Sequence, residues 1–534
     1  MYRDTMINAL DDGPWDILVV GGGCVGLGVA VDAATRGYRT LLLERGDFGQ
    51  GTSSRSTKLI HGGVRYLRQG RVRLVREALR ERARLHRNAP HLVWPLDFVI
   101  PCYGVRERLA YGVGLRAYDA LAGRDAFPPV RIVSGAGVLE RVPNARRDRL
   151  RSGVIYSDGQ FDDARLALSL AQTAVEHGAI VANYVRVDGF ITSAGRVAGV
   201  LATDTETGHT RELQARVVVN AAGPWADQLL SFGSAPARPS VTLSRGSHLV
   251  LPGDSLGSTA ALMVPTTDDG RVFFAVPWLG RVIVGTTDVQ VPQPDADPAP
   301  SPDEEAFLLR HASQYLDRAP DASDVLSRFA GLRALARPDD GGRHTKSISR
   351  EHSVSEKTPG LVTVVGGKWT TYRKVAQDAV DIGAAVAGLA RRPCLTDALA
   401  LHGAAGAAPR AESNADVEAL YGGEAAALRE LTRDRPELSA QLHPDLPYTH
   451  AHAVWAARHE MARTVEDVLA RRTRALLLDA AAAMDAGKTV ARLLAAELGW
   501  DEDRERTELV EFRRIAAPYL PSEPTSGARP ASSP

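Results

Sequence analysis

The chain has few cysteines. Its 534 residues include three of them, Cys24, Cys102 and Cys394, which are far apart and form no C-x-x-C pair. Such spacing supports neither a disulfide framework nor a structural metal site. We therefore expect a protein of a reducing compartment that binds no metal.

The chain also lacks an excess of charge and a long apolar run. Lysine and arginine together number 64, as do aspartate and glutamate, so no global field attracts nucleic acid or an anionic membrane. No uncharged apolar run reaches the roughly 18 residues that span a bilayer. The first residues, MYRDTMINALDDGPWD, lack the basic and apolar regions of a secretory signal. We expect a cytoplasmic protein that touches the cytoplasmic face of a membrane at most.

A nucleotide-binding pattern is present near the start of the chain. The apolar run DILVV is followed by GGGCVGLGVAVDAATRG, which begins with glycines and continues with helix formers, and then by YRTLLLE. Gly21, Gly23 and Gly26 form G-x-G-x-x-G, and Glu44 ends the next strand about 20 residues later, where its carboxylate can bind a ribose. This βαβ unit predicts a pyrophosphate at the amino end of the helix. The alternative is that the glycines serve only to pack the helix on the strand, and Cys24 is interpreted as a small apolar filler.

Two later stretches favour FAD over NAD as the nucleotide. VVVNAAGPW, residues 217–225, is a strand that enters a turn of small residues, and VVGGKWTT is another Gly-Gly turn before a helix. A long cofactor that touches several distant loops explains both stretches better than a nicotinamide bound to one half-domain. We therefore expect FAD as the cofactor.

Eight stretches together carry a family resemblance: DILVVGGGCVGLGVA, TSSRSTKLIHGGVRYL, NAAGPW, RGSHLVL, VGTTDV, GLRAL, GGKWTTYRK and EMARTVEDVLARRT. From about Asp16 to Gly499 the chain resembles the FAD-dependent glycerol-3-phosphate dehydrogenases of the aerobic, respiratory type. The resemblance implies oxidation of sn-glycerol 3-phosphate to dihydroxyacetone phosphate by hydride transfer to the flavin, with electrons passed to a membrane quinone. The chain departs from the family pattern at Ala334, where proline is usual, and at Trp369, where leucine or a similar residue is usual.

The resemblance implies an α/β fold class. It comprises a glutathione-reductase-like, Rossmann-type FAD-binding domain, an α+β substrate domain with an antiparallel sheet, and an all-α C-terminal domain. Helical periodicity after the small-residue stretch LHGAAGAAPRAE also indicates the last of these. The segments we expect are the FAD-binding domain in three parts (12–100, 156–239 and 341–392), a substrate or cap segment (101–155), the substrate domain (240–340), a linker (393–412), the helical domain (413–520) and a disordered tail (521–534).

A phosphate dianion as substrate requires cations in the site. By resemblance, Arg65 and Tyr66 of HGGVRYL lie at the substrate, and Arg333, Arg350 and Lys368 approach it from later segments. Arginine offers a bidentate fork and lysine a point charge. The alternative for any one of these cations is a solvated or salt-bridged position at the surface.

The proton acceptor is left open between two histidines. Arginine stays protonated and is a poor base, whereas His61 and His248 carry imidazoles that can titrate near neutral pH. The alternative for His61 is that it lines the flavin, and either histidine could be a structural hydrogen-bonding residue. The candidate catalytic residues are therefore His61, His248, Arg333 and Lys368.

The stretch TSSRSTKLIHGGVRYL, residues 52–67, has two expected tasks. Its first hydroxyls are suited to the FAD pyrophosphate and ribityl chain, with helix capping as the alternative. Its Gly-Gly pair lets the backbone approach the flavin ring closely. The residues expected at the cofactor are Gly21, Gly23, Cys24, Val25, Gly26, Glu44, Arg45, Thr52, Ser53, Ser54, Ser56, His61, Gly62, Gly63, Val187, Ala222, Gly223, Trp225, Gly367, Lys368 and Thr370.

Nine arginines and two acids lie between Arg65 and Arg87. Their pattern predicts an amphipathic helix over residues 68–87 with a basic outer face, which can lie on anionic lipid or be solvated. Residues 111–123 form a second, mildly apolar stretch that could enter a membrane interface or pack between domains. Nucleic acid is not expected, because no aromatic residues interleave with the arginines after Leu67. The oligomeric state is left open, with a homodimer as one alternative.

Three other functions are compatible with the same sequence. An oxidase of the same substrate would pass electrons to oxygen and produce peroxide. A related flavoenzyme would oxidise amines or amino acids, although such enzymes lack KLIHGGVRYL and the C-terminal helical domain. A flavin-fold protein without turnover would bind nucleic acid or a partner instead.

Overall fold

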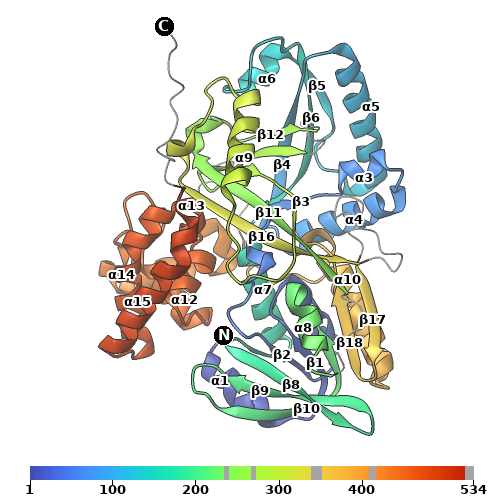
Figure 1. Cartoon of the computed structure of the whole chain (residues 1–534), viewed down its shortest axis with the longest axis vertical. Coiled ribbons are helices and arrows are strands. Elements are labelled where there is room, and N and C mark those ends of the chain that lie inside the picture. Colours follow the sequence, from blue (N-terminus) through green and yellow to red (C-terminus); the bar gives the residue numbers. More distant parts are fainter. Residues whose placement is uncertain (234–239, 266, 268–271, 338–351, 408–415, 523–534) are drawn as a thin grey trace.

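The computed structural model describes residues 1–233, 240–265, 267, 272–337, 352–407 and 416–522. Two sheets with their helices lie one above the other, and a group of helices formed by the C-terminal residues lies beside the junction between them (Figure 1). Arg350 and most of the expected disordered tail lie outside the described residues.

The first sheet begins with the glycine-rich βαβ unit. Parallel strands that are buried on both faces are continuous apolar runs, and β2 (Thr40–Leu43) is buried at each of its four residues. Among the described residues the spatial order is β17 (Ser353–Thr358), β18 (Leu361–Val365), β10 (Thr210–Asn220), β1 (Trp15–Val20), β2 (Thr40–Leu43) and β7 (Ile180–Ala182), with β8 (Val185–Ser193) joined through β9 (Arg196–Asp204) to β10. Since β18 runs parallel to β10, a strand after residue 360 completes a sheet that begins at residue 15.

Helix α2 (Cys24–Thr35) packs against both α7 (Asp163–Glu176) and α10 (Tyr372–Val386). Helix α7 begins directly after Asp162. The Asp162 carboxylate accepts hydrogen bonds from the Ala164 and Arg165 N–H groups, each at 3.0 Å, and so caps the helix. The other helices near this sheet are α1 (Arg3–Asn8) and α8 (Ala226–Leu230).

The second sheet is mainly antiparallel, and residues 44–60 lead into it from the first. Its strands, in the part of the chain that the structure describes, are in spatial order β15 (Val289–Val291), β11 (Val241–Pro252), β14 (Arg281–Gly285), β13 (Phe273–Trp278), β12 (Ala261–Val264), β4 (Val93–Cys102), β6 (Ser152–Phe161) and β3 (Leu59–Ile60), with β16 (Ser327–Ala336) paired to β11 and β5 (Arg131–Ser134) to β6. The accompanying helices are α3 (Val64–Arg68), α4 (Val72–Asn88), α5 (Val105–Ala122), α6 (Gly135–Arg141) and α9 (Pro302–Tyr315).

The C-terminal part is helical, as expected, and the α/β fold class with an all-α C-terminal domain is confirmed (Figure 1). Its main helices are α11 (Ala425–Asp434), α12 (His450–His459), the π-helix η10 (Asp467–Arg472), α13 (Ala475–Leu478), α14 (Ala480–Leu498) and α15 (Glu502–Ala516). Short 3₁₀ helices are η1 (Ala9–Asp12), η2 (Thr52–Ser54), η3 (Gly123–Asp125), η4 (Gly223–Trp225), η5 (Gly253–Ser255), η6 (Ala322–Asp324), η7 (Trp369–Thr371), η8 (Glu418–Glu424), η9 (Pro436–Ser439) and η11 (Ala517–Tyr519). The domain boundaries proposed from the sequence stay predictions.

The basic stretch forms two helices, so the single helix predicted over residues 68–87 is wrong at its start. Helix α3 ends at Arg68 and α4 begins at Val72, because the chain turns at Gly70, whose φ is 71°. Two charged residues of α4 point inward. Glu81 pairs with Arg373 at 2.7 Å, and Arg82 pairs with Asp158 at 2.8 Å. None of the described helices is long and apolar enough to cross a membrane.

Candidate active site

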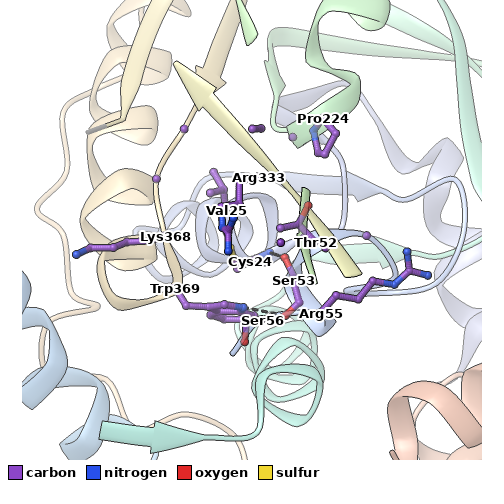
Figure 2. Close-up of a pocket in the computed structure, with 18 of the residues that line it drawn as sticks. Cys24, Val25, Thr52, Ser53, Arg55, Ser56, Pro224, Arg333, Lys368 and Trp369 are labelled. Carbon is purple, nitrogen blue, oxygen red and sulfur yellow. Dashed lines mark hydrogen bonds between the residues drawn. The ribbon is translucent and has the colours of Figure 1, made fainter. Parts of the chain in front are cut away.

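A cavity of about 1040 Å³ lies where the two sheets meet (Figure 2). Its walls come from the glycine loop after β1, the segment 43–57, strands β11 and β16, and the turn after β18. Its volume slightly exceeds the range of about 300–1,000 Å³ typical of ligand pockets. The cavity is therefore large enough for a dinucleotide together with a small substrate.

The glycine loop is as tight as its sequence predicts. Gly21 has a φ of 113°, and a Cβ at Gly26 would lie 1.8 Å from the Gly21 carbonyl oxygen. Helix α2 therefore starts close against β1, with its positive end at the cavity. The Ser53 hydroxyl accepts a hydrogen bond from the Cys24 N–H at 2.9 Å and ties the next segment to this loop. Burial raises the pKa of the Cys24 thiol to about 11, which fits its interpretation as an unreactive filler.

The Glu44 carboxylate and the Arg45 guanidinium lie at one end of the cavity. The Glu44 carboxylate accepts hydrogen bonds from the Gly22 N–H at 2.6 Å and the Gly46 N–H at 2.9 Å. Burial raises the pKa of Glu44, and these two hydrogen bonds oppose the rise. The Arg45 guanidinium lies 4.2 Å from the centre of the Trp225 ring. A strand-end carboxylate, a helix amino end and a Gly-rich loop are the groups that bind adenine dinucleotides, so these residues fit FAD.

Two cations from separate segments line the other part of the cavity. Arg333 on β16 donates to the Thr287 carbonyl at 3.1 Å and to the Thr286 hydroxyl at 2.9 Å. Gly246 on the adjacent strand leaves room for it, because a Cβ there would lie 2.2 Å from Arg333 Nη2. The Lys368 Nζ lies 5.5 Å from the centre of the Tyr66 ring. The structure thus brings together three residues that the sequence assigned to the substrate.

His248 is buried and its ring is fixed. It is 2% exposed, it stacks on Phe329 with ring centres 4.7 Å apart, and its Nε2 lies 2.9 Å from the Thr57 hydroxyl. Burial lowers the pKa of His248 well below 6.5, and the charges of Arg333 and Lys58 lower it further. The imidazole is therefore neutral at neutral pH. His61, in contrast, is half-buried at the cavity wall.

Most of the residues predicted from the sequence line this one cavity. Gly26, Ser54 and Gly62 instead lie behind its wall, and of Arg65 only its place in α3 is described. Those that line the cavity are Gly21, Gly23, Cys24, Val25, Glu44, Arg45, Thr52, Ser53, Ser56, His61, Gly63, Tyr66, Val187, Ala222, Gly223, Trp225, His248, Arg333, Gly367, Lys368 and Thr370.

Sequence reasoning missed several wall residues. Thr57 holds His248, and Thr286 holds Arg333, although both lie in stretches that carried the resemblance. The Trp369 indole donates to the Ser53 carbonyl at 2.8 Å, drawn as a dashed line in Figure 2. The departure at Trp369 therefore adds a link between the two loops. Ala334, the other departure, also lines the cavity.

Comparison with known proteins agrees with this geometry. Residues 16–373 match the family model described as FAD dependent oxidoreductase, and residues 394–505 match the C-terminal domain of alpha-glycerophosphate oxidase. The mitochondrial glycerol-3-phosphate dehydrogenase SDP6 of Arabidopsis thaliana is 40% identical over 98% of this chain and 89% of its own. A probable mitochondrial glycerol-3-phosphate dehydrogenase of Caenorhabditis elegans is 38% identical over 96% of this chain and 74% of its own. The solved glycerol-3-phosphate dehydrogenase of Bacillus halodurans, complexed with FAD, is 29% identical, covers 98% of this chain and 99% of its own, and has a TM-score of 0.78.

The fold, the cavity between the two sheets and the family match define the class: a flavoprotein oxidoreductase. Within that class the chain belongs to the FAD-dependent glycerol-3-phosphate dehydrogenase family. The resemblance found in the sequence is thereby confirmed, and so is the prediction of FAD as the cofactor.

Because the pKa of His248 is lowered, the free energy of unfolding should decrease as the solution becomes acidic. Below about pH 6.5 the unfolded imidazole takes up a proton, whereas the folded one does not, so stability that is present above pH 6.5 is lost as the pH falls. The slope reaches at most about 1.4 kcal/mol per pH unit for one proton. In His248→Gln the thermal midpoint should therefore fall less between pH 7 and pH 5 than in the parent, measured by circular dichroism. The exposed His209→Gln serves as the control, and equal slopes in all three proteins would refute the assignment.

Proposed function

We propose that this protein oxidises sn-glycerol 3-phosphate to dihydroxyacetone phosphate and passes the electrons to a membrane quinone. The observation that carries the proposal is the meeting of Arg333, Lys368, His61 and His248 at the wall of one cofactor-sized cavity. The Arabidopsis relative, 40% identical over nearly the whole chain, supports the choice of substrate.

Arg333 and Lys368 are suited to hold the phosphate dianion. Arg333 is anchored from behind by the Thr286 hydroxyl and the Thr287 carbonyl, which fix the plane of its guanidinium. A fixed guanidinium has the planar fork shape that matches phosphate oxygens. The Asp288 carboxylate lies 3.9 Å from Arg333 Nη1 and helps to orient the same group. Lys368 follows the Gly366–Gly367 turn and adds a point charge from another segment.

The proton of the substrate hydroxyl is better accepted by His61 than by His248. A proton on His248 would create a buried imidazolium facing the positive charges of Arg333 and Lys58. His61 is half-buried and lines the cavity, so an imidazolium there keeps contact with water. His248 then serves as a neutral hydrogen-bonding group, held by Thr57. Bound FAD supplies the hydride acceptor.

The test of the proposal is anaerobic addition of glycerol 3-phosphate to the purified flavoprotein. The flavin absorbance should bleach, and a water-soluble quinone should restore it. Arg333→Ala and Lys368→Ala should keep FAD but lose about 10- to 100-fold in kcat/KM, since hydrogen bonds to charged groups contribute about 1.5–3 kcal/mol each. Arg337→Ala, an exposed arginine just after β16, is the matched control.

Several outcomes of these experiments would contradict the proposal or a part of it. A spectrum that stays oxidised with glycerol 3-phosphate would remove the substrate assignment, and bleaching by an amine or amino acid would replace it. Rapid peroxide formation in air without quinone would instead establish an oxidase. Normal turnover in either cavity variant would remove that residue from the site.

The proton-transfer assignment predicts a difference between the two histidines. His61→Asn should lower kcat about 10²- to 10⁴-fold, the usual contribution of a general base, and should abolish the acidic limb of the kcat/KM profile. His248→Gln should retain that limb, because it removes only a neutral hydrogen-bonding ring. An acidic limb that disappears in His248→Gln and persists in His61→Asn would reverse the assignment.

A membrane contact next to this site would serve the proposed quinone step. Arg73, Arg76 and Arg80 lie exposed along α4. The neighbouring α5 exposes Leu109 and Val113 to 58% and 65%. A cationic stripe beside an apolar ridge is typical of helices that lie in the headgroup region of anionic membranes. We therefore propose that α4 and α5 together contact the membrane, in place of the basic helix alone.

This surface predicts binding to anionic vesicles. The parent should co-sediment with vesicles of phosphatidylcholine and phosphatidylglycerol and do so less with phosphatidylcholine alone. The double variant Leu109→Glu, Val113→Glu should weaken binding at least about tenfold, and Arg76→Glu about fivefold or more, since each cation contributes about 1 kcal/mol. Val510→Glu, which changes an exposed valine on α15, should bind as the parent does. Equal binding by all four proteins would exclude this face.

A further inference from the structure

The stretch EMARTVEDVLARRT, which carried part of the resemblance, contains Arg471 and Arg472 and is followed directly by Arg474. All three arginines are buried against the cofactor-binding part of the chain. Arg471, Arg472 and Arg474, called here the arginine triplet, extend from the π-helix η10 to the start of α13. Their side chains are 0–2% exposed. The triplet belongs to the C-terminal domain, and its members are not among the described residues that line the cavity. Each nevertheless contacts a segment that supplies the cavity wall.

The first contact fixes the segment after β2. Arg471 and Arg472 both donate to the Asp47 carboxylate, one bond of Arg472 measuring 2.9 Å. Burial alone would raise the pKa of Asp47, but Arg472 and Arg471 outweigh it, so the pKa lies below its ordinary value and the carboxylate is ionised. The Gln50 amide, at the cavity wall, donates to Glu466 at 3.2 Å. The loop between Glu44 and Gln50 is thus held from outside the cavity.

The second contact fixes the segment TSSRSTK. Arg474 donates to the Ser54 carbonyl at 2.8 Å and to the Asp163 carboxylate at 3.0 Å. Lys58 donates to the same two groups, at 2.8 Å and 2.7 Å. The Asp163 carboxylate also accepts from the Ser56 hydroxyl at 2.7 Å. The buried Asp163 carboxylate and the Ser54 carbonyl therefore fix the turn that carries the cavity-lining hydroxyl groups.

The third contact involves Tyr184, which lies directly before strand β8 at the cavity wall. The Tyr184 hydroxyl donates to the Asp467 carboxylate at 2.7 Å, and Arg471 donates to the same carboxylate at 2.6 Å. Tyr184 lines the cavity and has a φ of 57°, a conformation that non-glycine residues adopt rarely. Arg474, with a φ of 64°, is in the same region of backbone space. Contacts that hold both residues in this conformation outweigh its cost.

From these three contacts we infer that the arginine triplet holds the cofactor-binding loops in the conformation that binds FAD, so that the C-terminal domain is part of the FAD-binding apparatus. Its members are positioning residues, since they act through Asp47, Ser54 and Asp163. Buried ion pairs add little net stability but restrict the arrangement of their partners, and removal of one partner leaves an uncompensated charge. The inference rests on the FAD-dependent function proposed above.

The test measures FAD affinity without substrate, so it is independent of the identity of the substrate. Full-length apoprotein of the parent, Arg474→Met and Arg474→Lys is titrated with FAD, and quenching of flavin fluorescence gives Kd. Arg474→Met should raise Kd at least tenfold, and Arg474→Lys should restore much of the loss, because a lysine can still pair with Asp163. Arg458→Met is the matched control, since Arg458 pairs with Glu497 at 2.6 Å inside the C-terminal domain.

Thermal midpoints of the same proteins separate positioning from general stabilisation. The control should lose stability and keep its Kd within about twofold, while the Arg474 variants lose affinity beyond what their midpoints explain. If Arg474→Met does not fold, Arg474→Lys and Arg472→Lys carry the test, and each should raise Kd at least threefold. An unchanged Kd in the folded triplet variants, or an equal rise in Arg458→Met, would overturn the inference. Failure of glycerol 3-phosphate to bleach the flavin would leave the FAD titration unaffected.

Discussion

The ion pair between Arg474 and Asp163 lies where the C-terminal domain, the start of α7 and the segment after η2 meet. Both side chains are 0% exposed, and Lys58 shares the same carboxylate. Placing these charges out of water is costly unless each finds its partner in one arrangement. The ion pair therefore joins the C-terminal domain, the start of α7 and the segment after η2 in one arrangement, directly behind the cavity-lining residues Ser53 and Arg55.

The sequence predicted local features of the fold well. The strand, glycine turn and helix around Gly21 to Glu44 follow from periodicity and from the close approach that only glycine permits, and the structure has them there. The start of the helix in the basic stretch is predicted wrongly because arginines lie on both sides of Gly70, where the backbone turns. The inward position of Arg82 was also missed, since long charged side chains are mostly exposed and its partner Asp158 lies 76 residues away.

The separation of contacting residues along the chain also explains which part of the site could be predicted. Residues within recognisable stretches, such as Thr52, Ser53 and Lys368, lie at the cavity wall. Their roles toward cofactor and substrate stay predictions. The arginine triplet could not be predicted, because Asp47 and Asp163 lie 424 and 311 residues from their partners Arg471 and Arg474. A run of cations carries no local sign that carboxylates elsewhere in the chain will neutralise it. The overall composition, which has few cysteines and balanced charge, does not indicate these ion pairs either.

The charges of the cavity also limit the chemistry that its residues can perform. Glu44 lies at one end and Arg333 and Lys368 line another part. Under the proposed function, the first position is that of the ribose and the second that of the anionic substrate. Burial lowers the pKa of the His248 imidazole most, and the charge of the nearby Arg333 lowers it further. A buried cationic side chain that binds an anion thus disfavours the protonation of a buried base close to it. A base that works beside Arg333 must keep contact with water, which is the condition that His61 meets.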